Sequence, residues 1–310
     1  MSTHSDYFPY STGQNIPVRK VNSTLHKLDP TAECKYRLEC ISLKNHSIRF
    51  PRPITFPARK RFKKLMQGEG ATKNTLLTGL AELIGTGILV FVGCMGCVGS
   101  LGVLPSHFQI ALTFGFAVMI VIQCIAHISD AHVNPSVTVT AIVLGKKSIP
   151  EGLVYITAQV MGAILGYGML KVRRNPILTS MFCVTDLHAD LTAIQGLLLE
   201  GMATGILTLV VCAVWDYRNA KNMDSVPIKF GLTVAALATT FGPYTGCSMN
   251  PARSLAPAIW NNQWSHHWIY WFGPIGGALL SSFMYRTVFG RKEEDTEEET
   301  VPEKLREIKG

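Results

Sequence analysis

The chain has 310 residues, of which 47% are hydrophobic and only 16% are charged. Soluble domains usually carry about a quarter charged residues, so this balance indicates helices embedded in lipid rather than a soluble fold. The net charge of +8 comes largely from residues 1–74, which lack the alternating basic and aromatic pattern of a nucleic-acid binder. Nucleic acid is therefore not an expected partner.

Residues 1–74 form a polar, basic tail that we expect to be disordered and cytoplasmic. The tail lacks the features of a secretory signal, so the first apolar stretch is expected to direct the chain to the membrane itself. By the positive-inside rule, the basic run at its end stays in the cytoplasm and contacts anionic membrane lipid. This run consists of Arg59, Lys60, Arg61, Lys63 and Lys64.

Six apolar stretches approach the roughly 20 residues that a transmembrane helix needs. They cover about 75–99, 109–126, 152–170, 193–215, 228–246 and 268–288. An even number of spans puts both termini on one side, so the acidic tail at 290–310 is also predicted to be cytoplasmic. The sequence predicts a multi-pass protein of the cell membrane, although Lys171, Arg173 and Arg174 would lie outside, against the positive-inside rule.

An internal repeat organises the segment 75–289. A stretch that begins at Glu82 matches one that begins at Glu200, and the residues around Asn134 match those around Asn250 at nearly the same offset. The repeats cover about 75–172 and 193–289. Because each holds three spans, the second copy must cross the membrane in the opposite direction. Inverted repeats of this kind place functional sites near the midplane, on broken helices.

Each repeat contains an Asn-Pro pair followed by a short, weakly apolar stretch, at 136–144 and 252–260. Proline suits the first turn of a helix, and asparagine just before it is a good N-cap. Neither stretch can cross a bilayer, so we expect two half-helices that enter from opposite faces and meet at their N-termini. The predicted fold is an all-α membrane protein with six transmembrane helices and two re-entrant half-helices.

At these residues the sequence resembles the aquaporin (major intrinsic protein) family, from Thr75 to Phe289. The paired Asn-Pro boxes, the repeated glutamates and the run Ala252-Arg253-Ser254 carry the resemblance. It implies a homotetramer of channel domains at 75–289, and loops braced by Glu82 and Glu200. The implied pore centre consists of Asn134, Pro135, Ser136, Asn250, Pro251 and Ala252. Ser136 stands where alanine is common. Serine is small and can bond back within the half-helix, so little effect on the pore is expected.

The resemblance also implies a narrow aromatic/arginine filter, formed by Phe114, Ala238, Cys247 and Arg253. An arginine at membrane depth is costly and therefore functional by default. Strictly water-selective members usually carry histidine at the position of Ala238. Alanine makes the filter wider and less polar, as in the insect entomoglyceroporins. The alternative is a neutral change that leaves a strict water channel.

The resulting functional hypothesis is a passive channel for water and small neutral solutes such as glycerol and urea, which excludes protons and ions. A cation channel on the same scaffold is an alternative that Arg253 opposes, and an adhesive junction role is another. No phosphate-binding loop or nucleophile elbow is present, so neither an enzyme nor a cofactor is expected. His127 and the pair His266-His267 lack the second cluster that a metal site needs.

The eight cysteines suggest no disulfide framework. Cys183 is predicted to be alone in a loop. Four cysteines in apolar stretches are predicted to face lipid or the core: Cys94, Cys97, Cys124 and Cys212. Cys247 is the one placed at the expected filter, and it is therefore the predicted target of mercurials.

Overall fold

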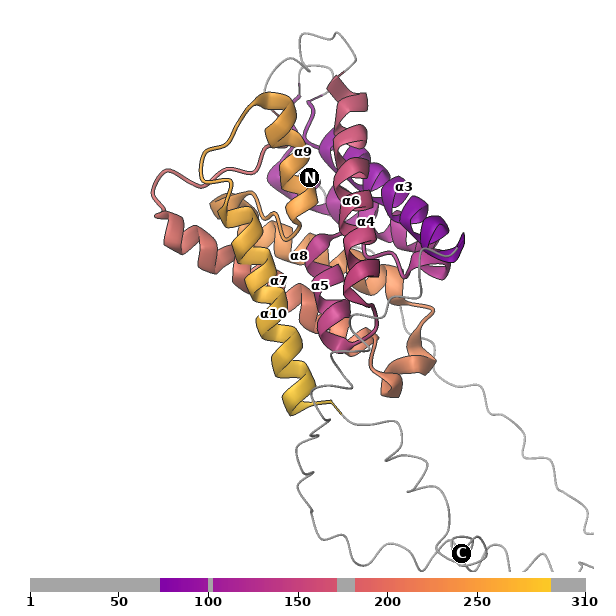
Figure 1. The fold of residues 1–310 in the computed structure, drawn as a ribbon. Coiled ribbons are helices and arrows are strands. Elements are labelled where there is room, and N and C mark those ends of the chain that lie inside the picture. The colour runs from indigo at the N-terminus through magenta and orange to yellow at the C-terminus, as the bar shows by residue number, and fades with distance from the viewer. Residues whose placement is uncertain (1–72, 100–102, 172–181, 291–310) are drawn as a thin grey trace, which may run out of the picture. The chain divides into compact units, whose positions relative to one another are not determined.

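The computed structural model describes residues 73–99, 103–171 and 182–290. Residues 1–72 of the predicted N-terminal tail, with its lipid-binding run, and nearly all of the acidic C-terminal tail lie outside these ranges. The described chain is built from α-helices and one 3-10 helix (Figure 1). Their bounds are α3 Lys73–Met95, α4 His107–Ser129, α5 Pro135–Leu144, α6 Ile149–Lys171, α7 Ala193–Val214, η2 Tyr217–Asn222, α8 Val226–Thr245, α9 Pro251–Asn261 and α10 Ile269–Val288.

The six predicted spans are all long helices, and the two Asn-Pro segments begin the short helices α5 and α9. The prediction for α3 was too long, because the helix ends at Met95 and not at residue 99. Gly96 follows directly, and a Cβ atom there would collide with the side chain of Thr113. Glycine is a poor helix former, which favours the end of α3 at this point. Its lack of a side chain lets the backbone of Gly96 lie close to α4.

Four helices in the described ranges are long and apolar enough to cross a membrane by length and composition alone: α3, α4, α6 and α7. The other two long helices, α8 and α10, have 20 residues each and include Lys229 and Arg286. Twenty residues match the roughly 30 Å of a bilayer core. In the second repeat, α8 and α10 occupy the places that α4 and α6 occupy in the first. We therefore take them as the remaining two membrane spans.

The helix contacts follow the symmetry of the inverted repeat. α3 packs against α4 and α6, and α7 packs in the same way against α8 and α10. Each half-helix lies against the last helix of the other repeat: α5 contacts α10, and α9 contacts α6. Figure 1 shows α9 above α5, with α6 beside both. The chain thus has the six-helix, two-half-helix fold that the sequence predicts.

Glycines allow the closest helix crossings. A Cβ atom on Gly162 of α6 would overlap the carbonyl oxygen of Leu83 in α3. In the second repeat, a Cβ atom on Gly277 of α10 would overlap the carbonyl oxygen of Gly201 in α7. Small residues allow this approach of helix backbones in membranes. These glycines therefore serve contacts within one protomer.

We expect Gly277→Ala to destabilise the protein by about 1–3 kcal/mol, the range for overpacking a filled core. The added methyl meets backbone atoms of α7, which cannot rotate away. Thermal unfolding of the purified protein in detergent measures the change. Gly276→Ala is the matched control, because nothing lies within 4 Å of a Cβ atom there. Equal melting temperatures for the two variants would contradict the close α7–α10 contact.

Candidate functional site

The two Asn-Pro pairs begin the half-helices as predicted from capping rules. The Asn134 side chain accepts a hydrogen bond from the Ser136 N–H at 2.9 Å. Asn250 accepts hydrogen bonds from the Ala252 and Arg253 N–H groups at 3.0 and 3.3 Å. Both asparagines have extended backbones, and proline follows each one at the first helical position. The N-cap oxygen therefore satisfies N–H groups that have no partner within the helix.

The asparagines also connect the two half-helices. The Asn134 amide donates to the carbonyl oxygen of Met249 at 2.8 Å, and the Asn250 amide donates to the carbonyl oxygen of Val133 at 2.8 Å. Each amide thus bonds the residue that precedes the other asparagine. This reciprocal pair fixes α5 and α9 with their N-termini facing each other at the centre of the fold.

The loops before both asparagines have an unusual backbone. Val133 and Met249 have φ angles of 44° and 52°, in the left-handed region that residues with a Cβ atom seldom adopt. Such conformations cost on the order of 1–3 kcal/mol each and persist only where the surroundings hold them. In both loops, a fully buried glutamate side chain accepts hydrogen bonds from the backbone.

Glu82 accepts hydrogen bonds from the N–H groups of His132 and Val133 at 2.9 and 2.7 Å. Glu200 accepts them from the N–H groups of Ser248 and Met249 at 2.8 and 2.9 Å. Each carboxylate also accepts from a hydroxyl at the end of the preceding helix: Ser129 on Glu82, Thr245 on Glu200. The two glutamates therefore occupy equivalent places in the two repeats.

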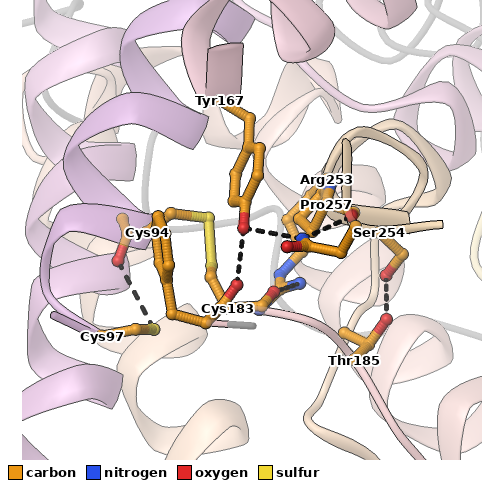
Figure 2. The surroundings of a disulfide bond; sticks show 11 residues. Cys94, Cys97, Tyr167, Cys183, Thr185, Arg253, Ser254 and Pro257 are labelled. Carbon is orange, nitrogen blue, oxygen red and sulfur yellow. Dashed lines mark hydrogen bonds between the residues drawn. A yellow bond between two sulfur atoms is a disulfide. The ribbon is translucent and has the colours of Figure 1, made fainter. Parts of the chain in front are cut away.

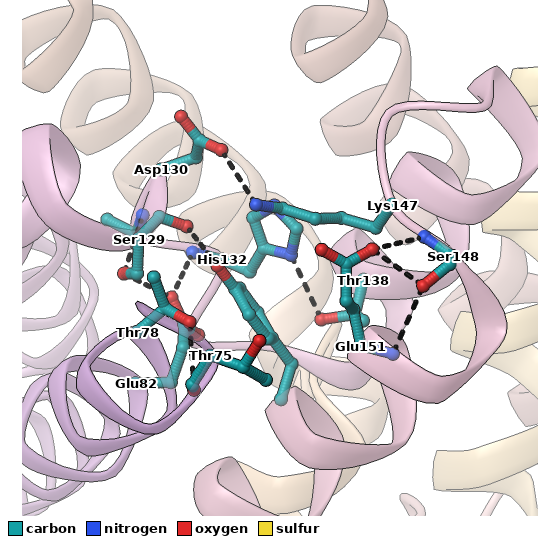
Figure 3. A network of polar contacts seen from close by, with 12 residues as sticks. Thr75, Thr78, Glu82, Ser129, Asp130, His132, Thr138, Lys147, Ser148 and Glu151 are labelled. Carbon is teal, nitrogen blue, oxygen red and sulfur yellow. Dashed lines mark hydrogen bonds and ion pairs between the residues drawn. The ribbon is translucent and has the colours of Figure 1, made fainter. Parts of the chain in front are cut away.

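The first repeat carries extra polar contacts (Figure 3). Gln159 of α6 donates to Glu82 at 2.8 Å and to the Thr138 hydroxyl at 3.0 Å. The His132 ring contacts the same hydroxyl at 3.2 Å and lies between two aromatic rings, those of Tyr155 and Trp215. The sequence assigned no role to His132, although it lies in the repeated segment around Asn134, nor to Gln159, which belongs to no recognisable motif.

Lys147 lies at the edge of this network, where its ammonium is 3.3 Å from the Asp130 carboxylate (Figure 3). Burial lowers the pKa of Lys147, but a hydrogen bond with Tyr155 and the Asp130 charge outweigh it and hold the pKa above its ordinary value. Lys147 is therefore charged at physiological pH. The ion pair fixes the loop that joins α5 to α6 against the end of α4.

A cavity of about 460 Å³ passes the two asparagines. We call one end of the cavity the Cys183 end; its lining residues are His107, Cys183, Val184 and Gly242. We call the opposite end the Trp215 end; its lining residues are Asp130, Trp215, Met223 and Val226. Apolar side chains form most of its wall between these ends. Asn134, Asn250 and Arg253 supply polar groups in its lining. A mostly apolar cavity with a few placed polar groups is typical of a site for small molecules.

All four residues predicted to form the filter line this cavity. The Arg253 guanidinium lies over the Phe114 ring, 4.9 Å from its centre. The Cys247 thiol donates to the carbonyl oxygen of Leu237 at 3.5 Å, which places it next to Ala238. Four positions far apart in the sequence are thus brought together by α4, α8, the loop before α9, and α9 itself.

Arg253 is buried, and its second anchor is a loop carbonyl. Its guanidinium donates to the carbonyl oxygen of Cys183 at 3.0 Å (Figure 2). Cys183 forms a disulfide bond with Cys94 in the last turn of α3. The predictions that the cysteines form no disulfide framework and that Cys183 is alone were therefore wrong. Cys94 itself is fully buried in the core, as predicted. The two cysteines lie far apart in sequence, and the fold brings the loop before α7 onto the end of α3.

The structure also bears on the expectations for Cys97 and Ser136. Cys97 packs against the core, as predicted, and it additionally lines the cavity. The Ser136 hydroxyl does not bond back within α5, since this buried group has no hydrogen-bond partner among the described residues. Of the other cysteines, Cys124 is exposed and Cys212 is buried.

His107 is a cavity residue that sequence reasoning missed. Its ring donates to the carbonyl oxygen of Thr239 at 3.1 Å and occupies the space left by Gly242. Its position two helical turns before Phe114 on the same helix was the available signal. Within the described ranges, no group of three or more His, Cys, Asp or Glu side chains could hold a metal ion.

Comparison with known proteins identifies the family to which the chain belongs. Residues 70–285 match the model of the major intrinsic protein family. Aquaporin-4 of Mus musculus is 39% identical over 213 residues, 67% of this chain and 66% of its own length. Aquaporin-2 of Bos taurus is 37% identical over 209 residues, 67% of this chain and 77% of its own length. The chain thus spans just under two thirds of the mouse relative's length.

A solved structure described as the aquaglyceroporin from Plasmodium falciparum shares the fold, with a TM-score of 0.61. Its sequence is 23% identical, and the match covers 69% of this chain and 96% of the other. The fold and site define a multi-pass, all-α membrane protein with a cavity between its helices. The chain belongs to the major intrinsic protein family, the family that its sequence resembles.

Proposed function

We propose that the protein is a passive channel for water and small neutral solutes such as glycerol and urea, and that it excludes protons and ions. The observation that carries this proposal is the cavity that passes both capping asparagines and Arg253. Aquaporin-4 and Aquaporin-2 among its relatives, and the named aquaglyceroporin, support this class of permeant.

The asparagine amides would act on permeating molecules at the centre of the cavity. An amide has two N–H donors, and one from each asparagine bonds the opposite loop. The other donor can bond the oxygen of a water or an alcohol in the cavity. The apolar wall offers few other hydrogen-bond partners, so the oxygen of each passing molecule would turn toward the asparagines. Its hydrogen bonds to the neighbouring molecules in the single row of permeants would then be reduced.

Positive charge would exclude cations and protons. Both half-helices point their N-termini at the centre, and a helix N-terminus carries a partial positive charge. Arg253 adds a full charge near the Cys183 end, and a fixed charge in a narrow pore repels ions of its own sign. These two features oppose the alternative of a cation channel.

The small side chain of Ala238 favours passage of glycerol and urea. A polyol could slide its carbon atoms past Phe114 and Ala238 while its hydroxyls bond Arg253 and loop carbonyls. This arrangement is the one that the resemblance to entomoglyceroporins implies. The alternative is that Ala238 does not set the width of the filter, in which case the protein is a strict water channel.

The disulfide supports the proposed orientation in the cell membrane. Disulfides form and persist in oxidising compartments, so the end of α3 that holds Cys94 would lie outside the cell. The start of α3, and with it the N-terminus, would then be cytoplasmic. Six spans return the C-terminus to the same side. We infer further that Glu82 and Glu200 brace the loops, that the basic run contacts lipid, and that four protomers assemble, each with its own pore.

Stopped-flow swelling of proteoliposomes tests the channel directly. We expect water permeability well above that of empty liposomes, with glycerol and urea gradients also collapsing faster. Planar-bilayer recording of the same preparation should show no cation current, because of Arg253 and the two helix N-termini. A robust cation current would overturn the proposal, and water flux without glycerol or urea flux would favour the strict water channel.

Mercurials are expected to block water flux through Cys247, which is 6% exposed and lines the cavity next to Ala238. A mercury adduct there would fill the narrow region. Swelling assays before and after mercury treatment measure the block, and Cys247→Ser should remove most of it. Cys97 also lines the cavity, so the double variant with Cys97→Ser should be fully resistant. A Cys247→Ser protein as sensitive as wild type would show that another cysteine controls the passage.

A further inference from the structure

We propose that the disulfide between Cys94 and Cys183 is a positioning element for Arg253, and that it thereby controls which solutes pass. This inference rests on the proposed channel function. It assigns a transport role to two residues that lie outside the four filter positions. The disulfide does not touch the permeant, and it acts through the loop carbonyl that holds the arginine.

The first step concerns the acceptor. Arg253 is 7% exposed, and its guanidinium donates to the carbonyl oxygen of Cys183 at 3.0 Å. The backbone of Cys183 has a φ angle of 60°, in the left-handed region that residues with a Cβ atom seldom adopt. A backbone in this region persists where its surroundings hold it. The covalent bond to α3 is such a restraint, at the residue whose carbonyl holds the arginine.

The second step concerns the rest of the loop (Figure 2). Before Cys183, the Phe182 carbonyl accepts a hydrogen bond from the Tyr167 hydroxyl at 2.8 Å. After it, the Thr185 hydroxyl donates to the Ser254 hydroxyl at 2.9 Å. These two hydrogen bonds connect the loop to α6 and α9. The disulfide connects it to α3, so the loop that carries the Cys183 carbonyl is bonded to three helices.

The third step concerns the other face of the arginine. The Phe114 ring, which lies against the guanidinium, packs on α3 at Gly93, where a Cβ atom would overlap the ring. Gly93 directly precedes Cys94. One turn of α3 therefore supports Arg253 from two sides, through the ring and through the loop carbonyl.

Breaking the disulfide would leave the acceptor loop held only by α6 and α9, and would loosen the carbonyl that binds Arg253 while leaving the arginine charged. The guanidinium would then leave the wall and seek solvation by water in the cavity, since a buried charge without partners is costly. A side chain in the lumen hinders wide solutes more than water. We therefore expect the ratio of glycerol to water permeability to fall by about tenfold. A change of this size corresponds to the loss of one hydrogen bond to a charged group.

The test begins with wild-type protein in proteoliposomes. Added dithiothreitol donates two electrons and two protons, so that the disulfide becomes two thiols and the reagent becomes its cyclic disulfide. Stopped-flow swelling gives water and glycerol permeabilities before reduction, after it, and after reoxidation. In parallel, modification of Arg253 by phenylglyoxal is followed by mass spectrometry, which reports its exposure whether or not the protein conducts. Thermal melting of each sample shows whether the fold is retained.

We expect reduction to lower the permeability ratio and to accelerate Arg253 modification, and reoxidation to reverse both changes. Cys94→Ser and Cys183→Ser should each behave like the reduced protein and no longer respond to the reagent. Cys124→Ser, at an exposed site on α4, is the matched control and should respond like wild type. Because reduction acts on folded protein, the test does not depend on whether the variants fold.

Two results would overturn the inference. One is a peptide map under non-reducing conditions in which Cys94 and Cys183 are not linked. The other is a reduced protein whose Arg253 modification rate and permeability ratio both equal those of the oxidised protein. If the oxidised protein fails to conduct water, the channel proposal fails separately, and the modification rate still decides whether the disulfide positions Arg253.

Discussion

Replacing Glu200 by alanine should lower the stability of the folded protein by about 3 kcal/mol or more, because each buried donor left without a partner costs about 1–3 kcal/mol. Three donors lose their acceptor: the Thr245 hydroxyl and the N–H groups of Ser248 and Met249. The left-handed backbone at Met249 also loses the group that holds it. Thermal unfolding in detergent and the yield of folded protein measure the effect.

Glu151→Ala provides the control for removing a carboxylate. Glu151 is only partly buried, and it accepts hydrogen bonds from the N–H and hydroxyl of Ser148 at the start of α6. Loss of such a cap usually costs about 1 kcal/mol, so Glu151→Ala should unfold at a temperature much closer to that of wild type. If Glu200→Ala proved as stable as Glu151→Ala, the bracing role of Glu200 would have to be abandoned.

The fold could be predicted from the sequence because its strongest signals are local. Apolar length defines each span, and the Asn-Pro pairs carry both the N-cap and the residue that suits a first helical turn. The inverted arrangement followed from the odd number of spans in each repeat. The end of α3 was missed because Gly96 leaves the helix to contact Thr113 of the neighbouring helix, which no local pattern reveals.

The site was only partly predictable. Arg253 and the asparagines lie within repeated motifs, whereas the acceptor of Arg253 is a backbone carbonyl, which no side-chain pattern marks. The disulfide had a signal that was overlooked. Cys94 falls at the end of the first span, and Cys183 in the loop after the third span, so the predicted topology already placed both on the same side of the membrane.

Exchanging Ala238 for histidine should separate the solutes that the channel passes. The new ring would project among Phe114, Cys247 and Arg253, which line the same cavity, and it would narrow the passage and add a polar group. We expect glycerol and urea permeabilities to fall at least tenfold, which corresponds to about 1.4 kcal/mol of added barrier. Water permeability should largely survive, because a smaller molecule still fits and can bond the imidazole. Parallel stopped-flow measurements with sucrose, glycerol and urea gradients give the three values.

Ala238→Ser is the matched control, since it adds a hydroxyl at nearly constant volume. If width decides the selectivity, the serine variant keeps glycerol flux while the histidine variant loses it. If polarity decides, both variants shift in the same direction. Equal losses of water and glycerol in Ala238→His would place the constriction elsewhere, and the imidazole of His107, bonded to the carbonyl of the adjacent Thr239, would be the first position to examine. Wild-type protein that passes no glycerol would instead assign the chain to the strict water channels, with Arg253 and Phe114 setting the width.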